Sequence, residues 1–151
     1  LMVFSSSAFA LKVGFVDIER VFSQYSGTKA AQEKLMKKKD EMEKKIEDEK
    51  KKLLAQKEDL DKKSGVLDRS NLQRQQEDLQ KKVVSLSKDA EEKARQLMRE
   101  EQEATGQIIE HIRAVVQQVA KEKKYDYVFE KNLILFGGDD LTFDVITKMN
   151  K

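Results

Sequence analysis

The sequence predicts a mainly helical α+β protein, in which a long α-helical coiled-coil hairpin projects from a small oligomeric β-containing body. Residues 28–124 contain no aromatic residue and no proline, and they are rich in Lys, Glu, Gln and Leu, which favour helix. All seven phenylalanines and all three tyrosines lie outside this stretch. Because large rings dominate ordinary cores, the body is expected to form from the two ends of the chain, residues 11–27 and 125–151.

The first ten residues, LMVFSSSAFA, are predicted to be the remnant of a secretory signal peptide. They are apolar and then small, and they end in the small-x-small pattern Ala8-Phe9-Ala10 at which such signals are cut. The alternative is an apolar N-terminal strand. Lys12 interrupts the stretch too early for a membrane span, which needs about 20 apolar residues. We therefore expect an exported protein that starts near Leu11 and has no membrane anchor.

Residues 11–27 should form a strand and then a helix. Val13–Val16 is a short apolar run of the kind found in buried strands, and Asp17 suits a helix N-cap. One apolar helical face follows, made of Ile18, Val21, Phe22 and Tyr25. At residues 26–28, Ser-Gly-Thr makes a kink or short break as plausible as a continuous helix.

The outgoing arm of the hairpin has a weak apolar seam. One heptad lane holds Leu35 and Met42, and the next holds Ile46, Leu53, Leu60 and Leu67. The complementary positions carry Lys, Glu and Gln, so the coiled coil should be much looser than an ideal one. The methionines of the arm, Met36, Met42 and Met98, are interpreted as seam residues.

The arm is predicted to turn at residues 64–71. Gly65 suits the C′ position of the outgoing helix, and Ser70 with Gln73 suggests a capping box for the returning one. The returning helix carries two apolar lanes and then a dense stripe near the body; these are Leu72, Leu79 and Leu86, then Val83, Ala90, Leu97 and Ala104, and then Ile108, Ile112, Val115 and Val119. We expect a firm base and a mobile tip.

The C-terminal end is predicted to add two strands and a helix. Residues 125–130 and 133–136 are β-prone, with a turn at Lys131-Asn132 between them. Residues 137–140, Gly-Gly-Asp-Asp, form another turn. The last helix is capped by Asp140 or Thr142, and its apolar face is Leu141, Val145, Ile146 and Met149.

A body of this size is too small to be stable alone, and three short strands leave open edges. Both problems are solved when several copies join their strands, so we predict an oligomer. The candidate residues of the oligomeric body are Val13, Phe15, Val16, Ile18, Phe22, Val128, Phe129, Ile134 and Phe136.

The sequence offers no enzymatic site. It lacks the phosphate-binding glycine motifs and the HExxH zinc motif, it has no cysteine, and its one histidine, His111, has no evident partners. We therefore predict no catalytic residue, no cofactor and no metal. Two observations argue against a nucleic-acid partner. The net charge is only +2, and the lysine runs alternate with acidic residues, as on a solvated helix face.

An exported, non-enzymatic oligomer with weakly seamed, mildly basic arms suggests a clamp for unfolded chains that works without ATP. The alternative is a structural coiled-coil spacer or adaptor of the cell envelope. The basic tips could also approach an anionic membrane surface. The candidate client-binding residues are Met42, Ile46, Leu53, Leu60, Val66, Leu67 and Leu72.

The two ends of the chain contain a set of recognisable segments, residues 12–17 (KVGFVD), 21–22 (VF), 119–120 (VA), 124–128 (KYDYV), 135–137 (LFG), 140–142 (DLT) and 145–146 (VI). In these segments the chain resembles the Skp/OmpH family of periplasmic chaperones of Gram-negative bacteria. The resemblance implies a homotrimer with three α-hairpin tentacles around a cavity. It also implies a holdase for unfolded outer-membrane proteins in the periplasm, with lipopolysaccharide as a further partner.

Overall fold

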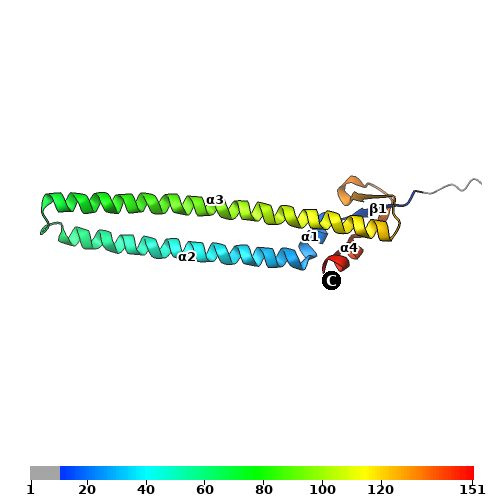
Figure 1. Ribbon diagram of the computed structural model, residues 1–151, viewed down its shortest axis with the longest axis horizontal. Coiled ribbons are helices and arrows are strands. Elements are labelled where there is room, and N and C mark those ends of the chain that lie inside the picture. The colour runs from blue at the N-terminus through cyan, green and yellow to red at the C-terminus, as the bar shows by residue number, and fades with distance from the viewer. Residues whose placement is uncertain (1–10) are drawn as a thin grey trace, which may run out of the picture. The chain divides into compact units, whose positions relative to one another are not determined.

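A computed structural model describes residues 11–151 of the chain (Figure 1). The predicted signal remnant, residues 1–10, lies outside the described residues. The elements are, in order, β1 (Val13–Val16), α1 (Ile18–Gln24), α2 (Ser26–Lys63), α3 (Arg69–Glu122), β2 (Tyr127–Glu130), the 3-10 helix η1 (Lys131–Leu133), β3 (Asp139–Asp140) and α4 (Thr142–Met149).

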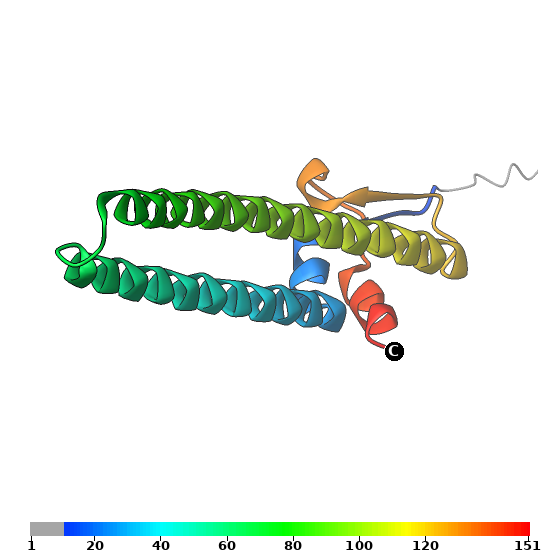
Figure 2. The same cartoon turned by 60° about the vertical axis from the view of Figure 1, so that its left-hand side comes forward.

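The chain divides into two compact units. The hairpin unit is Gln32–Gln102 and holds most of α2 with the first part of α3. The β-containing unit comprises the residues before and after it, up to Ala31 and from Glu103. Within the hairpin unit the two helices run antiparallel, side by side (Figures 1 and 2). The predicted fold class, a long helical hairpin plus a small strand-containing body, is confirmed.

The turn of the hairpin has a different chemistry from the predicted one. The Asp68 carboxylate accepts hydrogen bonds from the backbone N–H groups of Ser70 and Asn71, both at 3.0 Å, so Asp68 caps α3 and the predicted capping box at Ser70 is wrong. These bonds hold the pKa of Asp68 below its ordinary value. Gly65 does not adopt the left-handed C′ conformation, because the end of α2 is closed by Val66 and Leu67 donating to the carbonyl of Lys63.

The sheet of the β-containing unit has the order β2-β1-β3, and both outer strands run parallel to β1. Gly14 faces Val128 on one side and Asp139 on the other. The core beside this sheet is formed by α1, α4 and the last turns of α3. Its buried residues are Val16, Val21, Ile112, Val115, Val119, Leu141, Val145 and Met149.

The segment after β2 corrects the prediction of a second strand at residues 133–136. Residues 131–133 form η1, and the third strand is Asp139–Asp140, where a turn was predicted. The reason is topological: both outer strands are parallel to β1, so the chain must cross from one sheet edge to the other instead of making a tight hairpin. Gly137 and Gly138 adopt φ angles of 82° and 88°, which favour glycine and let the chain enter β3.

The helical stretch near residue 25 is broken. Tyr25 has an extended backbone between α1 and α2, and α2 already includes Ser26, Gly27 and Thr28. The Tyr25 ring lies directly against Gly27, where an added Cβ would be 2.3 Å from the nearest ring carbon. Glycine at position 27 is therefore what lets the aromatic ring cover the start of α2.

Two glycine substitutions are expected to change stability in opposite directions. Gly27→Ala should lower the free energy of unfolding by about 1–3 kcal/mol, because the new methyl group overlaps the Tyr25 ring. Gly106→Ala should raise it by about 0.5–1 kcal/mol, because Gly106 lies within α3 with open space around it. Urea unfolding of both variants tests this, and a stabilising Gly27→Ala would contradict the packing.

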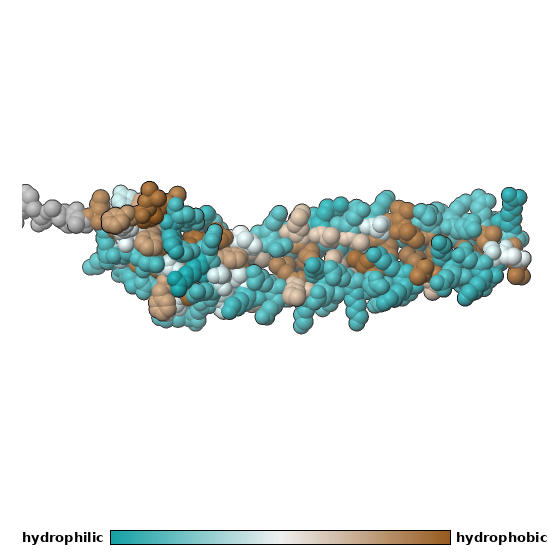
Figure 3. Space-filling model, turned by 180° about the vertical axis from the view of Figure 1, so that it is seen from behind, coloured by the Kyte–Doolittle hydropathy of each residue, from teal (hydrophilic) through white to brown (hydrophobic). Residues whose placement is uncertain are grey.

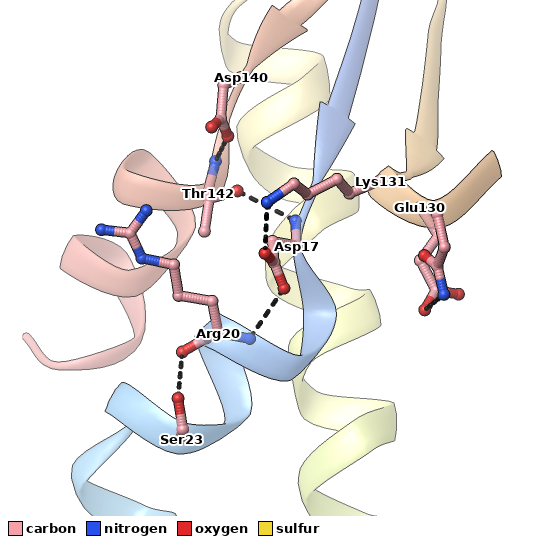
Figure 4. A network of polar contacts seen from close by, with 8 residues as sticks. Asp17, Arg20, Ser23, Glu130, Lys131, Asp140 and Thr142 are labelled. Carbon is pink, nitrogen blue, oxygen red and sulfur yellow. Dashed lines mark hydrogen bonds and ion pairs between the residues drawn. The ribbon is translucent and has the colours of Figure 1, made fainter. Parts of the chain in front are cut away.

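A polar network joins the ends of β1, β2 and β3 (Figure 4). Asp17 caps α1 as predicted, since its Oδ1 accepts from the backbone N–H of Arg20 at 3.0 Å, and its Oδ2 lies 2.9 Å from Nζ of Lys131. The backbone N–H of Asp17 donates to Oγ1 of Thr142, and the N–H of Thr142 donates to Oδ1 of Asp140. The N-cap position of α4 is Leu141, which makes no side-chain cap, so the predicted cap by Asp140 or Thr142 is wrong. Asp140 instead accepts from the first N–H of the helix, from one residue before the N-cap.

This network makes stability depend on pH. The hydrogen bond from Lys131, together with that from the backbone of Arg20, holds the pKa of Asp17 below its ordinary value of 3.8. Because the folded pKa lies below the unfolded one, the contribution is complete above pH 4–5 and is lost as the pH falls through the folded value. Asp17→Asn should cost about 0.5 kcal/mol at pH 7, since asparagine still caps α1 but loses the ion pair.

Asp17→Ala is the companion variant and should cost about 1 kcal/mol more than Asp17→Asn, because it also loses the cap. Urea unfolding at neutral pH and near pH 3 tests both. The wild type should lose more stability on acidification than either variant, and equal losses in all three proteins would show that Asp17 is not the titrating group.

Candidate functional site

The seam of the hairpin unit is mostly half-buried. Within residues 32–102, all of which the structure describes, Leu60 is the one buried apolar residue, with 6% of its surface exposed. It lies on the last turn of α2 before the connection. The dense stripe expected near the body is buried at Ile112, Val115 and Val119, and the mobility of the tip stays a prediction. Met36 and Met98 are exposed and do not belong to the seam.

Polar side chains connect the two helices where leucines are missing. Nζ of Lys38 lies 2.5 Å from Oε2 of Glu100, and Nζ of Lys82 donates to Oε1 of Gln56 at 3.3 Å. The contact with Lys38 lowers the pKa of Glu100. These exposed contacts contribute little to stability and leave the helices loosely joined.

The middle of the hairpin unit has an apolar groove of 340 Å³ between α2 and α3. Its lining contains two lysines, Lys50 and Lys57, and no carboxylate. We call this groove the apolar groove. Its apolar side chains come from Ile46, Leu53 and Leu54 on α2 and from Leu79, Val83, Leu86 and Ala90 on α3. Hydrophobic residues also reach the surface among hydrophilic ones in the space-filling view (Figure 3).

A second groove, of 480 Å³, differs in character because both acids and lysines line it, among them Glu49, Lys82 and Asp89. Leu53 and Leu86 line both grooves. These two leucines therefore lie between the apolar groove and the charged one.

The candidate client-binding residues are not brought together into one site. Ile46 and Leu53 lie in the apolar groove, and Leu60 lines a smaller cavity with Leu79. Val66, at the turn, is 89% exposed and next to half-buried Leu67. The remaining two candidates, Met42 and Leu72, are half-buried and line neither groove.

Sequence reasoning missed several groove residues. Leu54, Leu79 and Leu86 were not chosen as client-binding candidates, and Val83, expected in the seam, is 45% exposed. The signal that could have found Leu79, Val83 and Leu86, but not Leu54, is a shared spacing of i, i+4, i+7 and i+11 on the two helices. It begins at Ile46 on α2 and at Leu79 on α3.

The candidate oligomer residues divide between the core of the chain and its surface. Val16 is buried, whereas Ile18, Phe22 and Val128 are partly buried against the core. Val13, Phe15 and Ile134 are half-buried. Only Phe129 and Phe136 among the candidates are largely exposed.

The β-containing unit exposes several large apolar side chains. Phe136 and Leu135 are fully exposed, and the stacked rings of Tyr127 and Phe129, whose centroids are 6.2 Å apart, are also accessible. Leu133 and Phe143, missed by the sequence reasoning along with Tyr127 and Leu135, add to this exposed surface. Such side chains mark interaction surfaces, and β2 and β3 form the outer edges of the sheet.

The other candidate chemistry has a structural explanation. The His111 ring contacts the Tyr25 ring, with 5.7 Å between their centroids. In the part of the chain that the structure describes, no three His, Cys, Asp or Glu side chains converge on a metal position. Over the same residues, no helix is both long and apolar enough to span a bilayer.

Comparison with known proteins gives a family and several solved structures of similar fold. The sequence model of a family described as "Outer membrane protein (OmpH-like)" matches residues 12–149. A crystal structure from Caulobacter crescentus CB15, described as a putative OmpH-like outer membrane chaperone, superimposes with a TM-score of 0.85. It shares 18% identity, and the match covers 99% of this chain and 90% of the other. Among curated protein sequences there is no significant match.

Proposed function

Because the chain belongs to the OmpH-like outer membrane protein family, we propose that it is an ATP-independent periplasmic holdase chaperone. Its clients are unfolded outer-membrane β-barrel proteins, which it keeps from aggregating on their way to the outer membrane. The similarity in fold to the Caulobacter protein described as an outer membrane chaperone supports this proposal.

The observation that carries the proposal is the open apolar surface of the hairpin unit. Leu54, Val83 and Val84 are each more than 40% exposed, and the first two line the apolar groove. A protein that needed only a rigid rod would bury these side chains in a continuous seam. Exposed aliphatic side chains among mixed charges suit weak, reversible contacts with many unfolded segments. Because the contacts are weak, the client can be released without a nucleotide.

We propose that the protein acts as a homotrimer assembled through the β-containing unit. The exposed side chains around Phe136 and the open strand edges provide the surface, and joining several copies would cover both. The hairpins of the assembled copies would then hold one client between them. This arrangement explains why no single hairpin needs a deep pocket.

The turn of the hairpin is a further contact surface in this proposal. Val66 is exposed there, and Lys62, Lys63 and Arg69 are close to it in sequence. Cations beside an apolar side chain suit an anionic membrane surface or lipopolysaccharide. Binding of the chain to anionic vesicles, with loss of binding at high salt, is the expected result.

The holdase is tested by diluting a urea-unfolded β-barrel protein into buffer with and without the chain. A small molar excess should suppress light scattering without ATP, whereas unchanged aggregation would refute the proposal. Crosslinking from positions 53 and 60 distinguishes the chaperone from the alternative, a structural spacer of the cell envelope. Crosslinks to many unfolded proteins support the chaperone, and crosslinks to a single folded partner would support the spacer.

A further inference from the structure

The two walls of the apolar groove have the same residue spacing. Ile46, Lys50, Leu53 and Lys57 line it from α2, at i, i+4, i+7 and i+11. Residues at the same spacing on α3, Leu79, Val83, Leu86 and Ala90, line the facing wall. Both walls therefore contain residues seven positions apart, and Leu54 and Ser87 complete the lining. The half-buried leucines and Ile46 of this repeat belong to the seam as well, so the groove is the open side of the seam.

This repeat fits a helix better than an extended chain. Seven residues of α-helix rise about 10.5 Å, so a third helix with apolar residues every seven positions meets equivalent sites along both walls. In an extended strand, residues on one face are about 6.7 Å apart and lose register with sites 10.5 Å apart. The groove spans residues 46–57 of α2, or about 17 Å of helix.

The positive charge of the groove lining favours partner helices that carry acidic residues. Lys50 and Lys57 lie one heptad apart in the lining, and no carboxylate accompanies them there. Across residues 11–151, neither ammonium group forms a salt bridge, although the adjacent Lys51 and Lys52 pair with Glu47 and Glu49. Two unpaired cations one heptad apart match acidic residues at the flanking heptad positions of a partner.

We propose that the apolar groove binds an amphipathic α-helix of a partner protein, with leucine-like residues at the a and d positions and acidic residues flanking them. The docked helix makes a three-helix bundle with α2 and α3 and covers the side chains of Leu54 and Val83. This recognition does not depend on the chaperone function and takes a folded helix, not an unfolded client.

The probe is a fluorescent designed peptide of about three heptads, with leucine at a and d and glutamate at e and g. A second peptide has lysine in place of glutamate, and a third has the first composition in scrambled order. Full-length protein should bind the acidic peptide at least about tenfold more tightly than the other two, with a gain of helical circular dichroism. Equal binding of all three peptides, or binding without added helix, would overturn the proposal.

Charge-reversal variants locate the site. Lys50→Glu/Lys57→Glu should reverse the preference, so that the lysine peptide binds more tightly than the acidic one. The matched control is Lys81→Glu/Lys88→Glu, which makes the same charge change at the same spacing on α3 but lies outside the lining of the groove. Reversal in the control as well, or in neither variant, would overturn the assignment to the groove.

Two further measurements distinguish a partner helix from the other possible occupants of the groove, a second copy of the chain and an unfolded client. Val83→Asp should weaken binding of the acidic peptide about tenfold or more, without changing the solution mass of the protein. A changed mass would show that a second copy of the chain occupies the groove, which contradicts the proposal. A protein that binds the acidic peptide but does not suppress client aggregation would refute only the chaperone function. A protein that suppresses aggregation but does not bind the peptide would refute only the helix site.

Discussion

Replacing Phe136 with aspartate is expected to dissociate the oligomer. Phe136 is fully exposed on the single chain, so the substitution removes no contact of its own core. In the proposed assembly the ring is buried at an interface, where a charge should cost at least about 2 kcal/mol and raise the dissociation constant about 30-fold. Light scattering on a size-exclusion column should report a shift to the mass of one chain at micromolar concentration.

The matched control is Met36→Asp, which places the same charge at an exposed apolar residue of the hairpin unit. It should leave the mass unchanged. Both variants should keep the helical circular dichroism of the wild type at high concentration. A Phe136→Asp protein with the wild-type mass at every concentration would exclude this surface from the interface.

Replacing Ile112 with alanine should produce the largest loss of stability in the chain. The Ile112 side chain is fully buried in the core of the β-containing unit, among Val16, Val21 and Val145. Deleting its outer carbons leaves a cavity and should lower the free energy of unfolding by about 3 kcal/mol. Urea unfolding, followed by circular dichroism at a fixed chain concentration, measures the effect.

Val84→Ala on the same helix is the control, because Val84 is 42% exposed. It should change stability by no more than about 0.5 kcal/mol. Similar losses in the two variants would contradict the location of the core, since Ile112 and Val84 would then contribute equally.

The sequence predicted the helices and the location of the core well because these follow from periodicity. The absence of aromatic residues from residues 28–124 predicted the hairpin, and the stripe from Ile108 to Val119 predicted the part of α3 that lies in the core. Asp17 was recognisable as an N-cap because it separates an apolar strand from an apolar helical face. These features depend on residues that are close together in the sequence, so the sequence pattern alone can predict them.

The errors arose where long-range contacts decide the structure. Residues 133–136 are β-prone, but the parallel sheet uses Asp139–Asp140 as its third strand and leaves Leu135 and Phe136 exposed. Asp68, not Ser70, caps α3 because the connection ends two residues earlier than expected. In the candidate site, Val83 and Leu54 belong to a surface groove, because a heptad lane does not reveal which of its sides faces the other helix.

The central claim, that several copies of this chain jointly hold one unfolded client, is tested most directly by native mass spectrometry. The full chain is mixed with a urea-unfolded β-barrel protein during dilution and measured without nucleotide. The predicted result is a complex of three chains with one client, which Phe136→Asp prevents. A client bound by a single chain, or no complex under conditions in which the trimer is intact, would contradict the account.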